Sequence, residues 1–91
     1  MTALRLSIVG RVQGVGFRAW AVHEALRRNL RGLVRNRHDG SVETLVIGDA
    51  EAVAGMAAAC RFGPPLAQVI DVRQSPAEDD GSADFLEFPT D

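Results

Sequence analysis

The chain has 91 residues, the size of one small domain, which buries roughly 60–65% of the surface that its unfolded chain exposes. Apolar residues make up 46% and charged residues 24% of the sequence, which is typical of globular proteins and argues against disorder or a fibrous repeat. The formal net charge is −2, and no run approaches the ~20 apolar residues of a membrane-spanning helix. We therefore expect a single domain over residues 1–91 that does not associate with membranes.

The cysteine content and the N-terminus both predict a cytoplasmic protein. Cys60 is the only cysteine, so no internal disulfide can form, as is usual in a reducing compartment. The first apolar run is short and contains Arg5, unlike the apolar region of a secretory signal.

The charges are distributed unevenly along the chain. Residues 1–48 contain eight arginines and three acids, a net charge of +5, whereas residues 49–91 contain two arginines and nine acids, a net charge of −7. Every basic residue is arginine, whose planar guanidinium suits bidentate binding of phosphate or carboxylate. We interpret Arg27, Arg28 and Arg31 as the solvated face and exit of a helix rather than as a binding surface.

The first third of the chain predicts a strand, a glycine-rich loop and a helix. Residues 3–9 alternate between apolar and polar, as in a half-buried strand, and residues 10–16 interrupt this alternation with three glycines. From 17 to 30, apolar residues recur every three to five positions, which indicates an amphipathic helix. Asn29 is suited to end this helix in the left-handed conformation.

A hairpin is predicted next, with strands at 31–37 and 41–47 around the turn His38-Asp39-Gly40. Its second strand is apolar on both faces, because Leu45 and Ile47 lie opposite the expected core positions. This outer face must be covered, so we expect either a monomer that covers it or a homodimer formed through Leu45 and Ile47.

The spacing of apolar residues predicts a second helix that runs to about Phe62, with Asp49 at its N-cap and Gly63-Pro64-Pro65 at its end. Residues 67–74 predict an edge strand with a bulge, because their alternation breaks. A loop is expected at 75–83.

A short last strand is predicted at residues 84–88, which completes the order βαββαβ with a short fifth strand. This order indicates an α+β fold, the ferredoxin-like sandwich, with a four- to five-stranded antiparallel sheet and two helices on one face. The fold alone does not specify a function.

The glycine-rich loop and the following helix predict an anion site. Glycines allow successive main-chain N–H groups to converge, and a helix N-terminus adds about half a positive charge. Arg18, in the first turn of the helix, would direct its guanidinium to the same place. The loop fits neither GxxxxGK[ST] nor GxGxxG, so an ordinary strand-to-helix connection is an equally good interpretation of these residues alone.

The longer pattern resembles a known family. GRVQGVGFR at residues 10–18, followed after seventeen residues by Asn36 within GLVRNRHDGSVE, is similar to the paired signature of the acylphosphatases. The resemblance covers residues 4–73. It implies a ferredoxin-like fold and hydrolysis of acyl phosphates to a carboxylate and inorganic phosphate, with no metal or other cofactor.

By this resemblance, Arg18 and Asn36 are the catalytic residues. The side chain of Arg18 would hold phosphoryl oxygens together with the main-chain N–H groups of the loop, and Asn36 would orient the attacking water. An amide both accepts and donates hydrogen bonds, which suits positioning rather than proton abstraction. The residues that donate from the loop are Gln13, Gly14, Val15, Gly16, Phe17 and Arg18.

Other reactive residue types have simpler interpretations. Cys60 falls on the apolar stripe of the second helix and should be a buried small side chain. His23 and His38 have no neighbouring ligands at metal-binding spacing, so we expect no metal site. Leu33 stands where the resembled family usually has tryptophan, and the ending FLEFPTD at 85–91 departs from its usual last strand.

Two further classes of function compete with the hydrolase. One is an accessory module that binds acyl or carbamoyl phosphate without turnover, like the acylphosphatase-like domain of hydrogenase maturation proteins. The other is an RNA-binding module, which the absence of tyrosine and the slightly acidic composition disfavour, so we expect no nucleic-acid partner. The expected partner is a small-molecule acyl phosphate, whose acyl group the sequence does not specify.

Overall fold

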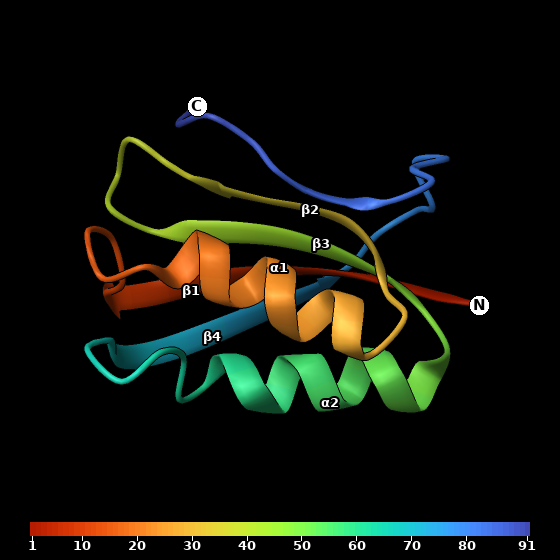
Figure 1. Cartoon of the computed structure of the whole chain (residues 1–91), viewed down its shortest axis with the longest axis horizontal. Coiled ribbons are helices and arrows are strands. Elements are labelled where there is room, and N and C mark those ends of the chain that lie inside the picture. The colour runs from red at the N-terminus through yellow and green to blue at the C-terminus, as the bar shows by residue number, and fades with distance from the viewer.

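The computed structural model describes residues 1–91 and has the predicted order of strands and helices (Figure 1). Each helix has 11 residues, and neither is long and apolar enough to cross a bilayer. The elements are β1 (Thr2–Arg11), α1 (Phe17–Arg27), β2 (Arg31–Asn36), β3 (Val42–Gly48), α2 (Ala50–Cys60), β4 (Gln68–Pro76) and β5 (Phe85–Glu87). The predicted α+β, ferredoxin-like class is confirmed.

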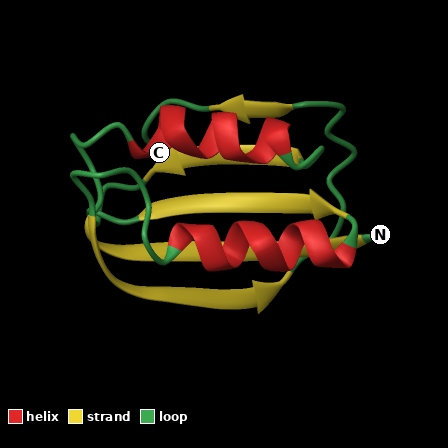
Figure 2. Ribbon diagram, turned by 60° about the horizontal axis from the view of Figure 1, so that its bottom comes forward, coloured by secondary structure: helices red, strands yellow, loops and turns green.

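The five strands form one sheet in the order β4-β1-β3-β2-β5, and both helices cover the same face (Figures 1 and 2). Neighbouring strands are antiparallel, as predicted, except that β5 is parallel to β2. The exception follows from the connection after β4. The chain leaves β4 at the end of the sheet far from the β1–α1 loop and crosses there to the opposite edge, so β5 must run in the direction of β2.

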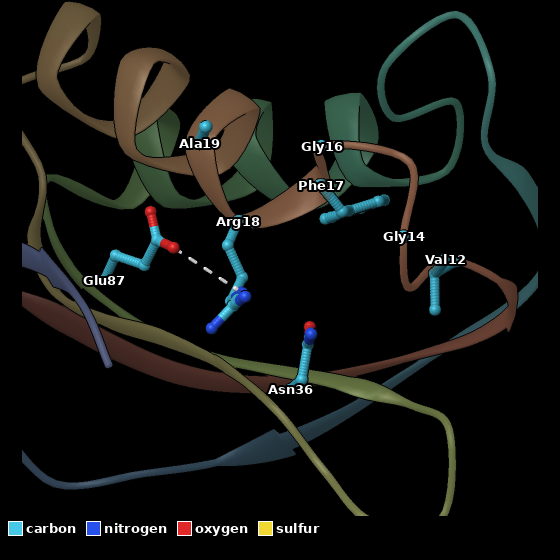
Figure 3. A pocket seen from close by; sticks show the side chains of 8 residues that line it. All are labelled: Val12, Gly14, Gly16, Phe17, Arg18, Ala19, Asn36 and Glu87. Atoms are coloured by element: carbon cyan, nitrogen blue, oxygen red, sulfur yellow. Dashed lines mark ion pairs between the residues drawn. The ribbon is translucent and has the colours of Figure 1, made fainter. Parts of the chain in front are cut away.

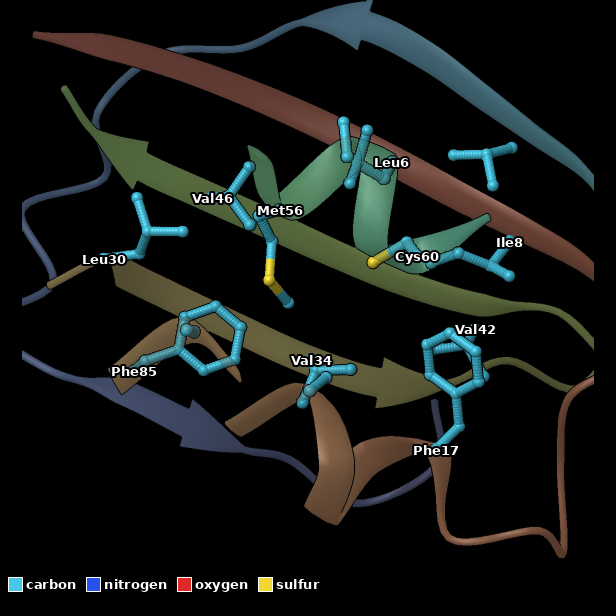
Figure 4. Close-up of a cluster of buried hydrophobic side chains, with 14 of the residues drawn as sticks. Leu6, Ile8, Phe17, Leu30, Val34, Val42, Val46, Met56, Cys60 and Phe85 are labelled. Atoms are coloured by element: carbon cyan, nitrogen blue, oxygen red, sulfur yellow. The ribbon is translucent and has the colours of Figure 1, made fainter. Parts of the chain in front are cut away.

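The core lies between the sheet and the two helices (Figure 4). Leu6 and Ile8 of β1 are fully buried there together with Met56 of α2, and Phe17 of α1 is 2% exposed. Burial of such a side chain stabilises the fold by about 1.5–3 kcal/mol. Cys60 is also fully buried, as predicted, and burial raises the pKa of its thiol to about 12.

The end of α1 is determined by Asn29, which has a φ of 57°. The N–H groups of Asn29 and Leu30 fold back to donate to the carbonyl oxygens of Leu26 at 3.1 Å and Ala25 at 2.9 Å. This is the Schellman arrangement, which satisfies the last carbonyl groups of a helix. The predicted role of Asn29 is confirmed, and the regular helix ends at Arg27 rather than at residue 30.

The start of α2 differs in one detail from the expectation. Asp49 occupies the N-cap position, and its main-chain oxygen accepts the N–H of Val53 at 2.9 Å. Its carboxylate makes no capping hydrogen bond, so its side chain does not act as the cap.

The predicted bulge lies in the edge strand β4. Val9 pairs with Asp71 and Gly10 pairs with Val69, so Ile70 is the extra residue. The strand extends to Pro76, into the residues predicted as a loop, because its pairing with β1 continues to that position.

The outer face of the sheet is covered by the chain itself. Leu45 is 2% exposed and Ile47 is fully buried, so neither needs a partner to cover it, and the predicted dimer surface is not available. Residues 77–84 cross between the two edges behind the sheet in Figure 1. This crossing segment is held by hydrogen bonds from Ala77 N–H to the Ala3 carbonyl, at 3.3 Å, and from Gly32 N–H to the Asp84 carbonyl, at 3.0 Å.

A charge network lies on the same outer face around Glu43, whose side chain is 12% exposed. Its carboxylate lies 2.7 Å from the Arg35 guanidinium, 3.2 Å from that of Arg37 and 3.3 Å from that of Arg5. Burial alone would raise the pKa of Glu43, but the hydrogen bonds and charge of Arg35, with the charges of Arg5 and Arg37, outweigh it and lower the pKa below its usual 4.5.

We predict that Glu43→Gln destabilises the protein at pH 7 by about 1–3 kcal/mol, between the values for exposed and buried ion pairs. Because the folded pKa is lowered, the stabilisation is present above the usual value of 4.5 and is lost as the pH falls through the folded pKa. Urea unfolding of both proteins from pH 7 to pH 3 should therefore show a difference that shrinks in acid. Glu78→Gln, at an exposed position, is the matched control. If wild type and Glu43→Gln differ in stability as much at pH 3 as at pH 7, the lowered pKa of Glu43 is wrong.

Candidate active site

A small hollow of about 150 Å³ lies where β1 ends and α1 begins (Figure 3). It is bounded by the glycine-rich loop, the first turn of α1, the end of β2 and the end of β5. The residues that line it are Val12, Gly14, Gly16, Phe17, Arg18, Ala19, Asn36 and Glu87. The structure thus brings Asn36 together with four of the six predicted loop residues, Gly14, Gly16, Phe17 and Arg18, whereas Gln13 and Val15 do not line the hollow.

The main-chain N–H groups of the loop are unpaired. From Gln13 to Ala19, seven consecutive N–H groups donate no hydrogen bond within the chain, and the first helical bond runs from Trp20 N–H to the Gly16 carbonyl at 3.0 Å. A helix alone leaves only its first few N–H groups unpaired. The loop adds those of residues 13–15, and the N-terminus of α1 contributes a partial positive charge to the same hollow.

Both ends of the loop are anchored in the core, where Val12 is 1% and Phe17 2% exposed. Its middle is tied to the β2–β3 turn by the side chain of Gln13. The amide nitrogen of Gln13 donates to the carbonyl oxygens of Arg37 at 2.7 Å and Ser41 at 2.9 Å. The loop therefore has a fixed position relative to Asn36, the residue before Arg37.

Two glycines give the loop its shape. Gly14 and Gly16 have φ angles of 74° and 80°, in the left-handed region that side chains disfavour. Apart from the two adjacent residues, no atom of the protein would lie within 4 Å of a Cβ at either position. These positions therefore require glycine for its conformation and not for lack of space.

The guanidinium of Arg18 is held from one side. Its Nη1 donates to the Phe88 carbonyl at 3.2 Å, and its Nε lies 3.6 Å from Oε2 of Glu87. Glu87 approaches from the side away from Gly14 and Gly16 (Figure 3). Nη2 has no partner within the chain, which leaves it available to a ligand in the hollow.

Asn36 is the last residue of β2, and its side chain points into the hollow (Figure 3). Its main chain is held on both sides. It pairs with Val42 of β3, and its carbonyl oxygen accepts the N–H of Asp91 at 3.0 Å. The amide group therefore projects from a firmly held strand end and makes no hydrogen bond to the rest of the chain.

The sequence interpretation missed Glu87 and Phe88 as neighbours of the site. A usable signal was the strand period of two, which places Glu87 on the same face as the buried Phe85. Its closeness to Arg18 depends on where β5 joins the sheet, which no local pattern shows. His23, His38 and Cys60 do not line the hollow, and no three His, Cys, Asp or Glu side chains are grouped to hold a metal.

Comparison with known proteins agrees with this geometry. A family model described as acylphosphatase matches residues 4–86. The chain belongs to the acylphosphatase family. An acylphosphatase of Acidiphilium cryptum is 51% identical over 90 residues, which covers 99% of each chain. Close homology of this kind identifies the chain as an enzyme with acylphosphatase activity, as the sequence resemblance implied.

Solved structures of the family confirm the fold. The crystal structure of acylphosphatase from Bacillus subtilis superposes with a TM-score of 0.93 at 37% identity and covers 97% of this chain and 99% of that chain. Full-length HypF, solved in a phosphate- and nucleotide-bound form, contains a similar segment, with a TM-score of 0.90 at 27% identity. This match covers 99% of the present chain and only 12% of HypF.

We predict that Gly16→Ala and Gly55→Ala change stability in opposite directions. The first places a side chain in the left-handed conformation, at a cost of about 1–2 kcal/mol, whereas the second, inside α2, should stabilise by about 0.5–1 kcal/mol. An added Cβ at Gly55 would meet only the flexible end of Arg28 at 3.4 Å. Urea unfolding measures both changes, and a neutral Gly16→Ala would show that this loop does not need its observed conformation.

Proposed function

We propose that the main-chain N–H groups from Gln13 to Arg18, together with the Arg18 guanidinium, bind the phosphoryl group of an acyl phosphate, and that Asn36 orients the attacking water. The observation that carries this proposal is the run of unpaired N–H groups opposite Arg18 and Asn36. Such donors would otherwise face only water, and they suit a phosphate dianion.

This arrangement matches the demands of phosphoryl transfer. The transition state is loose and carries its charge on the non-bridging oxygens, so catalysis depends mainly on positioning and neutralisation. The N–H groups, the N-terminus of α1 and the guanidinium supply that neutralisation. A charge-assisted hydrogen bond from Arg18 contributes about 1.5–3 kcal/mol when it is shielded from water.

Asn36 would fix the water in line with the bond that breaks. The water oxygen forms the new bond to phosphorus, the bond from phosphorus to the acyl oxygen breaks, and the carboxylate departs with the electron pair. The proton of the water passes to the phosphate product or to solvent. Because a carboxylate is a good leaving group, this step does not require a strong general base at the position of Asn36.

The size of the hollow supports recognition of the phosphoryl group rather than of the acyl group. The hollow measures only about 150 Å³, and the residues proposed to bind the phosphoryl group and to orient the water form much of its lining. The acyl part would then extend past the rim, so several small acyl phosphates should be substrates. The cytoplasmic location stays a prediction from the cysteine content and the N-terminus.

A second candidate is an accessory module that binds acyl or carbamoyl phosphate without turnover. The similarity to a segment of HypF favours it. The hydrolase has stronger support, because the Acidiphilium acylphosphatase is matched over 99% of its own length. Binding of phosphate without turnover of any acyl phosphate would favour the accessory module.

We predict that the purified protein hydrolyses benzoyl phosphate in the presence of a chelator. Arg18→Ala should lower kcat about 10²- to 10³-fold and weaken competitive inhibition by phosphate, because a charge-stabilising donor is lost. Asn36→Ala should lower kcat about 100-fold and leave the inhibition constant of phosphate unchanged, because only the water loses its partner. The measurement is steady-state hydrolysis with inorganic phosphate as inhibitor.

Arg11→Ala is the matched control, since Arg11 is exposed beside the same loop and does not line the hollow. It should retain wild-type kinetics. Full activity in both Arg18→Ala and Asn36→Ala would refute the proposed roles, and loss of wild-type activity with chelator would refute metal-independent hydrolysis.

A further inference from the structure

We propose that residues 87–91 are a positioning segment for the active site, in which one end orients Arg18 and the other end holds Asn36. This inference rests on the roles proposed above for these two residues. Neither Glu87 nor Asp91 would touch the reacting atoms, so both are positioning residues.

The first end of the segment acts on Arg18. Glu87 and Phe88 together engage Nε and Nη1 of the guanidinium, at 3.6 Å and 3.2 Å. Glu87 approaches from the side away from the glycines (Figure 3), and Nη2 is left without a partner within the chain. The side chain of Arg18 is 31% exposed and would otherwise sample many rotamers.

The other end of the segment holds the strand that carries Asn36. Phe88 N–H donates to the Val34 carbonyl at 2.8 Å, and Asp91 N–H donates to the Asn36 carbonyl at 3.0 Å. The first bond continues the parallel pairing of β5 with β2, and the second lies past the end of β5 and is shifted by one residue from that register. Asn36 is therefore bonded on both sides, although it is the last residue of its strand.

The carboxylate of Asp91 reinforces this attachment. It lies 3.6 Å from Nε of Arg37 and 3.8 Å from Nη1 of Arg35, the two neighbours of Asn36 in the chain. The N–H of His38 also donates to the main-chain oxygen of Asp91 at 3.3 Å. The ion pairs are long and half exposed, so we expect the N–H of Asp91 to matter more than its carboxylate.

The two ends predict different kinetic signatures. Loss of orientation at Arg18 weakens phosphoryl binding, whereas a loosened Asn36 misplaces the water and affects only the rate. Glu87→Ala should raise both KM for benzoyl phosphate and the inhibition constant of inorganic phosphate about two- to fivefold. Glu87→Gln keeps an acceptor oxygen for Nε and should recover most of this loss.

Asp91→Pro removes the N–H that holds Asn36 and should lower kcat about two- to fivefold, with the inhibition constant of phosphate unchanged. Asp91→Ala keeps the N–H, is the matched control for the carboxylate, and should lie close to wild type. Leu86→Ala controls for the strand itself, because this side chain is 54% exposed and does not line the hollow. Circular dichroism identifies the temperature range in which all variants are folded, and the kinetics are compared within that range.

The decisive outcomes separate this proposal from the one on which it rests. If Arg18→Ala is inactive while Glu87→Ala and Asp91→Pro keep wild-type kinetics and differ only in thermal stability, the positioning role is wrong. Tighter phosphate binding by Glu87→Ala would also overturn it, because Glu87 would then compete with the ligand. Full activity of Arg18→Ala would instead refute the proposed catalytic roles.

Discussion

The structure depends on keeping a row of main-chain N–H groups unpaired in a fixed place. An unpaired N–H that is shielded from water costs about 1–3 kcal/mol, so a row of such donors is tolerated only where water or a ligand reaches it. Here the two ends of the loop are held in the core by Val12 and Phe17, and its interior adopts positive φ angles at Gly14 and Gly16. Core packing therefore maintains the open donors, which remain at the surface where water or an anion can satisfy them.

The uneven charge of the chain is partly matched within the molecule. Four ion pairs join arginines of the basic first half to acids of the second half, and they attach the crossing segment and the C-terminal residues to β2 and α1. These ion pairs are Arg31 with Asp79, Arg18 with Glu87, and Arg35 and Arg37 with Asp91. Arg31 is thus not simply a solvated helix exit, as its sequence position suggested. Exposed pairs are individually weak, so they assist the main-chain hydrogen bonds of these segments rather than replace them.

The features that local sequence predicts are those with a local physical cause. The strands and helices follow from apolar spacing, the end of α1 follows from Asn29, and the bulge in β4 follows from a broken alternation. The parallel direction of β5, the burial of Ile47 and the contact of Glu87 with Arg18 were not predictable in this way. All three depend on the path of residues 77–84, which carry no apolar period that could indicate where they cross.

The chemistry explains why such non-local contacts matter for the site. With a carboxylate as leaving group, the reaction has little need of a tuned acid or base. The rate then depends on the positions of the proposed catalytic side chains, Arg18 and Asn36. Arg18 reaches the hollow on a long flexible side chain, so its position depends on what holds the guanidinium. Asn36 is short, so its position depends on the backbone of β2. Main-chain hydrogen bonds outside the hollow are therefore as much a part of the proposed mechanism as the side chains within it.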